Sequence, residues 1–305
     1  MRAVRFDRYG GVDELHIREV PDPQPTPGRA IVRVKAAAIN PGEIMIRIGA
    51  LEAMYPATFP SGEGSDFSGE IVSLGAGATG FSVGDAVLGW SDERASHAEL
   101  VSMPVEQLVA KPEGLSWDVA GSMYVAPMAA LASVGAVAPR DGDMVVVSAA
   151  AGGVGVVAVQ LVKRAGATVI GLAGADNHEW LRAHGVVPVL YGDGQEERIR
   201  AAAGGRVDAF IDLFGAGYVD LALALGVPTD RINTIADFQA VQEKGVKGQG
   251  TGDAGGAAAL GGLVALAASG DLDIPIARTY PLSEVREAYR LLADRHTHGK
   301  IVLHP

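Results

Sequence analysis

The stretch SAAAGGVGVVAVQ, residues 148–160, constrains the fold more than any other part of the chain. A short apolar run, MVVVS, ends at its first residue, and a helical pattern that ends at Gly166 follows it. Ala149, Gly152 and Gly155 therefore lie on a predicted strand-to-helix turn with the spacing A-x-x-G-x-x-G. A turn of this kind between a strand and a helix is typical of βαβ units that bind dinucleotides.

The small residues of this turn have a physical reason. A glycine at position 152 lets the backbone approach a pyrophosphate, and the amides and dipole at the start of the helix favour its negative charge. Gly155 allows the helix to pack closely on the strand. We predict that Ala149, Gly152, Gly153 and Gly155 belong to the cofactor site. An ordinary small-residue turn is the alternative, and a second strand at the expected distance argues against it.

That second strand, within ATVIGLAGADNHEW, indicates which dinucleotide is bound. NAD sites usually have an acid about 20 residues after the turn, where it binds the ribose 2′-hydroxyl. Gly174 stands there, and the first acid, Asp176, lies further into the loop, while His178 is near enough to approach a 2′-phosphate. The sequence therefore favours NADP(H) over NAD. An exposed residue at the start of a helix is the other interpretation of His178.

The texture of the sequence divides the chain into three segments. Residues 1–117 are rich in short strand-like runs between Pro and Gly signals, and residues 118–270 alternate apolar runs with helical patterns. Residues 271–305 read as strand, helix and strand, so we expect them to rejoin the first segment. The chain is predicted to be an α/β protein, with a Rossmann-type parallel-sheet domain and a barrel-like β domain built from both chain ends.

Composition excludes several functions. The chain has no cysteine, which excludes disulfides, thiolate metal ligands and a cysteine nucleophile. Its formal charge of −11 disfavours nucleic acid and anionic membrane surfaces as partners. No apolar run reaches the 18 or more residues that a membrane span needs, and the first residues do not resemble a signal peptide. A cytoplasmic location is therefore expected.

Six stretches carry a resemblance to a known family. The chain resembles the zinc-independent quinone oxidoreductases of the medium-chain dehydrogenase/reductase superfamily. The resemblance implies a GroES-like β-barrel domain around the Rossmann domain, NADPH between the two, and a homodimer. The stretches, in family order, are AAAINPGEIMIRIG (36–49), GSDFSGEIVSLG (64–75), FSVGDAVLG (81–89), AAAGGVG (149–155), VDAFIDLFG (207–215) and HTHGKIVL (296–303).

The resemblance also implies roles for single residues. It places Asn40 near the nicotinamide, Tyr191 near the adenosine phosphate and Val154 beside the cofactor. Asn40 is alternatively a turn residue before Pro41, and Tyr191 a half-buried aromatic at a strand end. The positions where zinc-dependent members hold their metal correspond to Asn40 and Ser65, which do not suit zinc, so we expect no metal.

The chain departs from the family pattern in the implied nicotinamide pocket. Met45 stands where relatives commonly have a tyrosine, and MYVAPMAA (123–130) replaces a segment with the pattern LPxxGLTA. Tyr124 is new at this place and is our candidate for an additional O–H donor. A buried tyrosine bonded to a backbone carbonyl is the alternative. Asp66 and Asp85 lie in Gly-bounded stretches, where we expect each to bond its own backbone turn.

These observations favour an NADPH-dependent reductase that acts on a quinone or an α,β-unsaturated carbonyl compound. Asn40 and Tyr124 are the predicted catalytic residues, because donors aimed at the substrate oxygen stabilise the charge that develops there. A noncatalytic NADPH-binding protein that senses redox state or engages a partner is a second hypothesis, since the pocket is altered and the turn is intact. A zinc alcohol dehydrogenase is a third.

Overall fold

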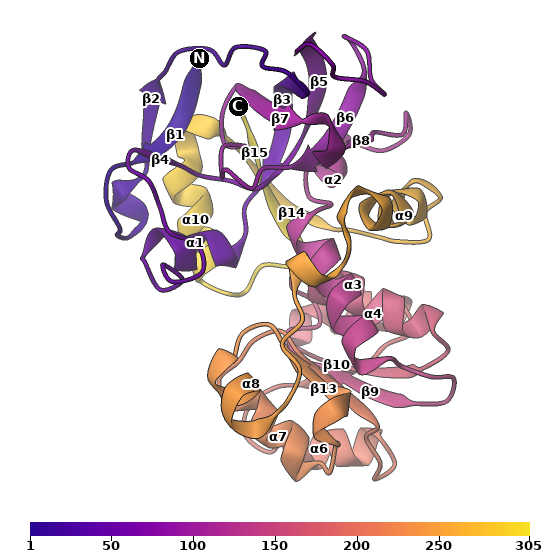
Figure 1. The fold of residues 1–305 in the computed structure, drawn as a ribbon. Coiled ribbons are helices and arrows are strands. Elements are labelled where there is room, and N and C mark those ends of the chain that lie inside the picture. The colour runs from indigo at the N-terminus through magenta and orange to yellow at the C-terminus, as the bar shows by residue number, and fades with distance from the viewer. The chain divides into compact units, whose positions relative to one another are not determined.

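The computed structural model describes residues 1–305 and divides them into two units, each with its own apolar core (Figure 1). Unit 1 comprises residues 1–125, 255–271 and 275–305, and unit 2 comprises residues 126–254 and 272–274.

Five short apolar runs form the sheet of unit 2. All neighbouring strands are parallel, in the order β11-β10-β9-β12-β13. Val145 on the central strand lies opposite Val169 on one side and Ala209 on the other. The runs are apolar without alternation because both faces of such a sheet are covered. The strands are β9 (Met144–Val147), β10 (Thr168–Ala173), β11 (Val187–Leu190), β12 (Ala209–Asp212) and β13 (Ile232–Thr234).

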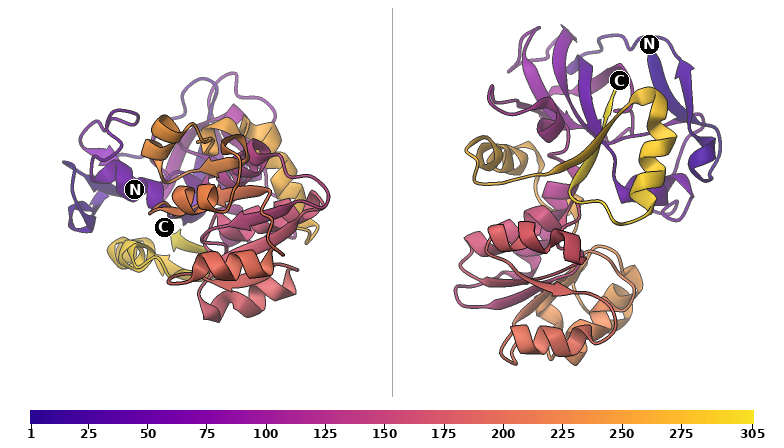
Figure 2. Two further views of the ribbon diagram at one scale, coloured as in Figure 1. Left: turned by 90° about the horizontal axis from the view of Figure 1, so that it is seen from below. Right: turned by 180° about the vertical axis from the view of Figure 1, so that it is seen from behind.

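Helices flank both faces of this sheet (Figure 2). The chain leaves β9 toward β10 and β11 and then returns to the other side of β9 for β12 and β13, so right-handed crossovers put the helices of the outward half on one face and those of the return half on the other. The reversal makes the carboxyl end of β9 the topological switch point, where sheets of this type bind ligands. The helices are α3 (Val125–Val137), α4 (Gly155–Arg164), α5 (His178–Ala183), α6 (Gln195–Ala202), α7 (Tyr218–Ala224) and α8 (Phe238–Lys244).

Strands from both chain ends build unit 1. The last strand, β15, pairs antiparallel with β3, where Val302 lies opposite Ala38, and parallel with β14. One sheet has the order β14-β15-β3-β5-β6-β8, with β7 also on β3, and a smaller sheet has the order β2-β1-β4. The strands are β1 (Arg2–Phe6), β2 (His16–Glu19), β3 (Arg29–Ala38), β4 (Ser61–Gly62), β5 (Asp66–Leu74), β6 (Ala86–Trp90), β7 (Leu100–Pro104), β8 (Leu108–Ala110), β14 (Ile276–Pro281) and β15 (Lys300–His304).

The helices of unit 1 are fewer. Helix α1 begins after Asn40, with Pro41 in its first turn and the Glu43 carboxylate accepting the Asn40 N–H at 2.7 Å. These helices are α1 (Pro41–Arg47), α2 (Trp117–Ala120), α9 (Gly256–Ala268) and α10 (Val285–Ala293).

The division into units differs from the boundaries expected at residues 117 and 270. Residues 118–125 and helix α9 group with unit 1, and α9 contacts β8 there. Helix α9 consists only of Gly, Ala, Leu and Val, so no polar face in its sequence indicates where it packs. The predicted α/β class, with a parallel Rossmann-type sheet and a β domain made from both chain ends, is confirmed. No helix has the length and hydrophobicity needed to cross a bilayer.

Candidate functional site

The glycine-rich turn connects β9 to α4 at the switch point of the parallel sheet. Gly152 N–H bonds the Ala149 carbonyl at 2.9 Å, and Val156 N–H bonds the Gly152 carbonyl at 2.9 Å. The backbone of Ala149 is left-handed, with φ 46°, which a small side chain tolerates better than a large one. Gly153 and Val154 lie within the same turn. The five predicted turn residues are thus gathered in front of the α4 N-terminus, where backbone amides favour an anion.

The two fingerprint glycines have different surroundings. A Cβ atom at Gly155 would lie 2.1 Å from the Ala149 oxygen and 2.7 Å from the Ala150 carbonyl carbon, so the backbone itself requires glycine there. A Cβ atom at Gly152 would meet only the Ala149 oxygen, at 3.3 Å. The space in front of Gly152 is therefore not filled by protein. Packing within the protein does not require a glycine at position 152, and this is the position that is expected to face the ligand. The turn therefore fits a pyrophosphate.

The remaining predicted cofactor residues lie at the ends of β10 and β11. A Cβ atom at Gly174 would lie 3.8 Å from the Tyr191 hydroxyl, so these two residues are neighbours, and the Tyr191 side chain is 43% exposed. His178 lies 3.2 Å through Nε2 from the Ala173 carbonyl, which holds its ring at the end of β10. Asp176 is exposed. No carboxylate stands at the strand end itself. The roles proposed for Gly174, His178 and Tyr191 remain predictions.

Sequence reasoning missed Asp212, which organises the carboxyl edge of the same sheet. Its buried carboxylate accepts the Ser148 hydroxyl at 2.8 Å, the Thr234 hydroxyl at 2.7 Å and the Gly215 N–H at 3.0 Å. These bonds join the ends of β9, β12 and β13 beside the glycine-rich turn. The available signal was an acid that ends the apolar run AFID, because a carboxylate at the end of a buried strand needs internal donors.

In unit 1, Asn40 is buried and its amide is bonded at both ends. Lys300 Nζ donates to Asn40 Oδ1 at 2.5 Å, and Asn40 Nδ2 donates to Asp66 Oδ2 at 2.8 Å. The expectation that Asp66 bonds its own turn is wrong: it begins β5 and binds residues distant in the sequence. The same expectation for Asp85 is confirmed, because its carboxylate accepts the Ser82 N–H at 2.7 Å. The catalytic role of Asn40 remains a prediction.

Tyr124, the other predicted catalytic residue, lies in the same neighbourhood. Its N–H donates to Asp66 Oδ1 at 3.0 Å, and its ring is stacked on Trp90, with centroids 4.4 Å apart and planes inclined by 5°. Its hydroxyl accepts or donates no hydrogen bond within the protein, so the backbone-carbonyl alternative is not observed. Burial, helped by the negative charges of Asp92 and Asp66, raises the pKa of Tyr124 to about 12. At neutral pH this hydroxyl is a donor that stays protonated.

Within unit 1, a buried polar cluster extends from Asn40 toward α10. The Tyr289 hydroxyl donates to Glu43 at 2.7 Å, and Arg47 forms a buried ion pair with Glu63 while its guanidinium lies 4.5 Å over the Tyr289 ring. Burial raises the pKa of Glu63 to about 8 against the opposing charge of Arg47. Burial also lowers the pKa of His97. The cluster anchors α1, and hence the position of Asn40, to α10.

These residues do not fit a zinc ion. Asn40 Oδ1 accepts from an ammonium, Ser65 N–H donates to Glu43 at 3.0 Å, and no group of three or more His, Cys, Asp or Glu side chains is arranged to hold a metal. The positive charge beside Asp66 comes from Lys300, 3.8 Å away. The chemistry of the donor set thus disagrees with a zinc site.

Elemental analysis tests this point directly. We expect protein purified without added metal to carry no stoichiometric zinc, and incubation with a chelator to leave its thermal unfolding temperature unchanged. The physical reason is that oxygen donors already bonded to Lys300 offer no tetrahedral set. A zinc-to-chain ratio near one that the chelator removes with loss of stability would contradict the prediction.

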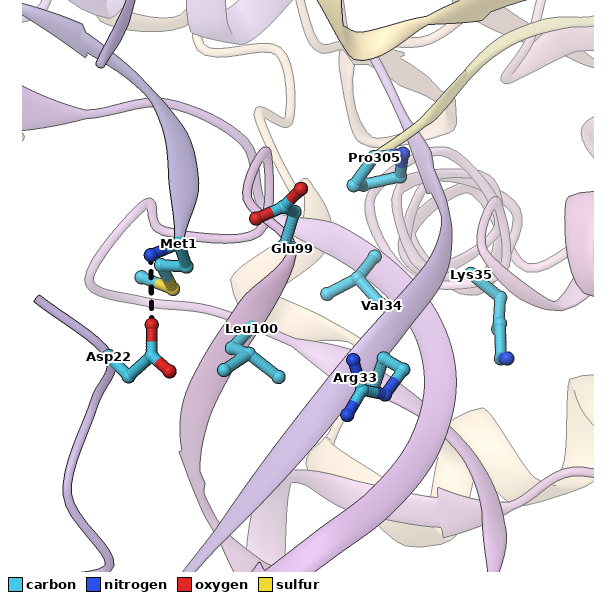
Figure 3. A pocket seen from close by; sticks show the side chains of 8 residues that line it. All are labelled: Met1, Asp22, Arg33, Val34, Lys35, Glu99, Leu100 and Pro305. Atoms are coloured by element: carbon cyan, nitrogen blue, oxygen red, sulfur yellow. Dashed lines mark hydrogen bonds and ion pairs between the residues drawn. The ribbon is translucent and has the colours of Figure 1, made fainter. Parts of the chain in front are cut away.

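A hollow of unit 1 lies elsewhere and contains none of the predicted site residues. It has a volume of about 540 Å³, and Figure 3 shows its lining side chains, with the Met1 amino group paired to Asp22 at 2.8 Å. Lys35 in the same wall is paired with Glu70 at 3.1 Å. The lining residues are Met1, Asp22, Arg33, Val34, Lys35, Glu99, Leu100 and Pro305.

Two segments of the chain match known protein families. Residues 26–114 match the alcohol dehydrogenase GroES-like domain, and residues 181–303 match a family described as zinc-binding dehydrogenase. The fold is similar to that of the quinone oxidoreductase from Coxiella burnetii, with 30% identity, a TM-score of 0.89, and 100% and 99% of the two chains covered. A structure described as an NAD-dependent alcohol dehydrogenase is similar at 27% identity and a TM-score of 0.88, with both chains fully covered.

Curated sequences agree with these structures. A chloroplastic quinone oxidoreductase from Triphysaria versicolor is 27% identical over 100% of this chain and 98% of its own length. This chain spans only 60% and 48% of the length of two further curated relatives.

Proposed function

The chain belongs to the zinc-independent quinone oxidoreductase family of the medium-chain dehydrogenase/reductase superfamily, and we propose that it transfers hydride from NADPH to a quinone or an α,β-unsaturated carbonyl compound. The observation that carries the proposal is the open space at Gly152, at the α4 N-terminus and the switch point of the parallel sheet. An anionic dinucleotide is the ligand that such a turn suits best.

The residues of unit 2 bind and orient the cofactor in this proposal. The amides of residues 152–155 bind the pyrophosphate, Tyr191 and Gly174 contact the adenosine part, and His178 meets the 2′-phosphate. When bound, the nicotinamide supplies the hydride. Asp212 keeps the ends of three strands in register beside the turn.

The residues of unit 1 act on the substrate. Tyr124 offers the O–H that no protein group accepts, and it donates to the substrate oxygen as negative charge develops there. With a pKa raised to about 12, it acts as a hydrogen-bond donor that does not ionise at neutral pH, and solvent protonates the product. Asn40, held between Lys300 and Asp66, shapes the polar wall of the same site.

A substrate panel tests the activity. NADPH oxidation is followed by its absorbance with benzoquinones, naphthoquinones, enals and enones at equal concentration. We expect turnover on at least one conjugated acceptor and none on saturated ketones, because only a conjugated acceptor yields a stabilised enolate or hydroquinone. An inert panel with intact NADPH binding would instead support the noncatalytic alternative. Recovery of a partner protein by the NADPH-bound form, and not by the NADPH-free form, would then identify that role.

Cofactor preference provides a separate prediction. We expect NADPH to bind about tenfold more tightly than NADH, equivalent to about 1.4 kcal/mol, because the end of β10 lacks a carboxylate and His178 lies beside it. Calorimetric titration with each cofactor measures the ratio. His178→Ala is expected to weaken NADPH binding and leave NADH binding unchanged. A preference for NADH in the unaltered protein would contradict the proposed 2′-phosphate contact.

The same proposal includes a cytoplasmic homodimer. Light scattering on the purified protein measures its mass in solution. A monomer at all concentrations would contradict the homodimer.

A further inference from the structure

One buried carboxylate joins both predicted catalytic residues. Asp66 Oδ1 accepts the N–H groups of Tyr124 at 3.0 Å and Val125 at 2.7 Å, and Oδ2 accepts Asn40 Nδ2 at 2.8 Å. We propose that Asp66 is a positioning residue that fixes Tyr124 and Asn40 for catalysis, with Lys300 as its counter-cation. This inference rests on the proposed function, in which Tyr124 donates to the substrate oxygen and Asn40 shapes the polar wall of the same site.

The sheet register strengthens this connection. Asp66 lies directly opposite Trp90 in the β5–β6 pair, and Trp90 is the residue on which the Tyr124 ring is stacked. One cross-strand pair therefore holds both parts of Tyr124: Asp66 binds its backbone and Trp90 supports its ring. A shift of Asp66 would move the hydroxyl that the proposed mechanism uses.

The donors around Asp66 require an ionised carboxylate. Three N–H groups point at its two oxygens, and the Lys300 ammonium lies 3.8 Å from Oδ2. A protonated acid or an amide would place a donor against one of these donors. Burial raises the pKa of Asp66 and lowers the pKa of Lys300, and the attraction between the two groups opposes both shifts. The pair is thus interdependent, because either charge alone would be buried without compensation.

Lys300 acts through Asn40 as well as through Asp66. Its Nζ donates to Asn40 Oδ1 at 2.5 Å, so the Asn40 amide has its oxygen toward the ammonium and its nitrogen toward the carboxylate. This arrangement defines the amide orientation. Lys300 is 3% exposed and Asp66 is 1% exposed, so solvent does not compete for these bonds.

Asp66→Asn and Lys300→Met test the proposal, with Lys300→Arg as the charge-preserving variant. We expect the first two to lower kcat by about tenfold to a hundredfold, since small displacements of positioned groups have effects of this size. NADPH affinity should stay within about twofold, because neither Asp66 nor Lys300 shares a bonding partner with the residues proposed to bind the cofactor. Lys300→Arg is expected to recover most of the kcat lost in Lys300→Met. The matched controls are Glu70→Gln and Lys35→Met, a half-buried ion pair on β5 and β3.

Fluorescence gives a readout that does not depend on turnover. In a Trp117→Phe, Trp180→Phe background, Trp90 is the remaining tryptophan and reports the stacked Tyr124 ring. We expect Asp66→Asn to shift Trp90 emission in folded protein, and Glu70→Gln to leave it unchanged. Circular dichroism establishes that each variant is folded. Should Asp66→Asn fail to fold, Lys300→Met decides by the same measurements.

The outcomes separate this proposal from the proposed function. Unchanged kcat and unchanged Trp90 emission in folded variants of an active enzyme would overturn the positioning role and leave the reductase assignment intact. An unaltered protein that is inert on every acceptor would overturn the reductase assignment, and the Trp90 emission of Asp66→Asn would still decide whether Asp66 holds Tyr124. A loss of kcat in Asp66→Asn and Lys300→Met that the two control variants show equally would also overturn the positioning role of Asp66.

Discussion

Replacing Gly152 with valine is expected to weaken NADPH binding by at least about a hundredfold, equivalent to about 2.7 kcal/mol, while unit 2 stays folded. The branched side chain would fill the space in front of the α4 N-terminus and exclude the pyrophosphate from the backbone amides. The fold should tolerate it, because a Cβ atom at this position meets a single protein atom at 3.3 Å and the backbone there is not left-handed.

Titration calorimetry with NADPH measures the loss, and circular dichroism checks the fold. The matched control is Gly135→Val, which introduces the same side chain at an exposed position of α3 with nothing within 4 Å. It should leave NADPH affinity unchanged. If Gly152→Val bound NADPH as tightly as the unaltered protein, the dinucleotide site would have to be sought elsewhere.

Local sequence patterns were sufficient to predict the parallel sheet and its turn. The β-branched runs, such as MVVV in β9, and the glycines at fixed spacing act through neighbours within a few residues, so they can be recognised without knowing the fold. The carbonyl positions that exclude a side chain at Gly155 belong to Ala149 and Ala150, only five or six residues away. The geometry that requires such a motif therefore involves only residues that are close in the sequence.

The polar interior of unit 1 could not be predicted in the same way. Asp66 binds groups 26, 58 and 59 residues away, and Lys300 binds an amide 260 residues away. No periodicity connects positions at such separations, and a Gly-bounded Asp favours a turn, so the local pattern indicated a turn residue. The sequence therefore predicted Asn40 and Tyr124 as separate candidates, whereas the structure joins them through one carboxylate.

The structural glycine of the fingerprint should respond in the opposite way to Gly152. Gly155→Ala is expected to destabilise unit 2 by about 3 kcal/mol, because the new Cβ atom would lie 2.1 Å from the Ala149 oxygen and must push α4 away from β9. Urea unfolding followed by Trp180 emission, in a Trp90→Phe, Trp117→Phe background, measures the stability of unit 2 alone. Gly135→Ala is the control, and it should not destabilise unit 2, since alanine is more favourable than glycine inside a helix.

An unfolding midpoint unchanged by Gly155→Ala would show that the turn can open without cost, and the packing argument would then be wrong.

The two substitutions together separate the two roles of one motif. If valine at position 152 removes the cofactor from a stable unit, and alanine at position 155 destabilises the unit even without cofactor, then the first glycine is required by the ligand and the second by the backbone. A generic small-residue turn would require glycine at position 155 only, so the response at Gly152 is what distinguishes a dinucleotide site from an ordinary crossover.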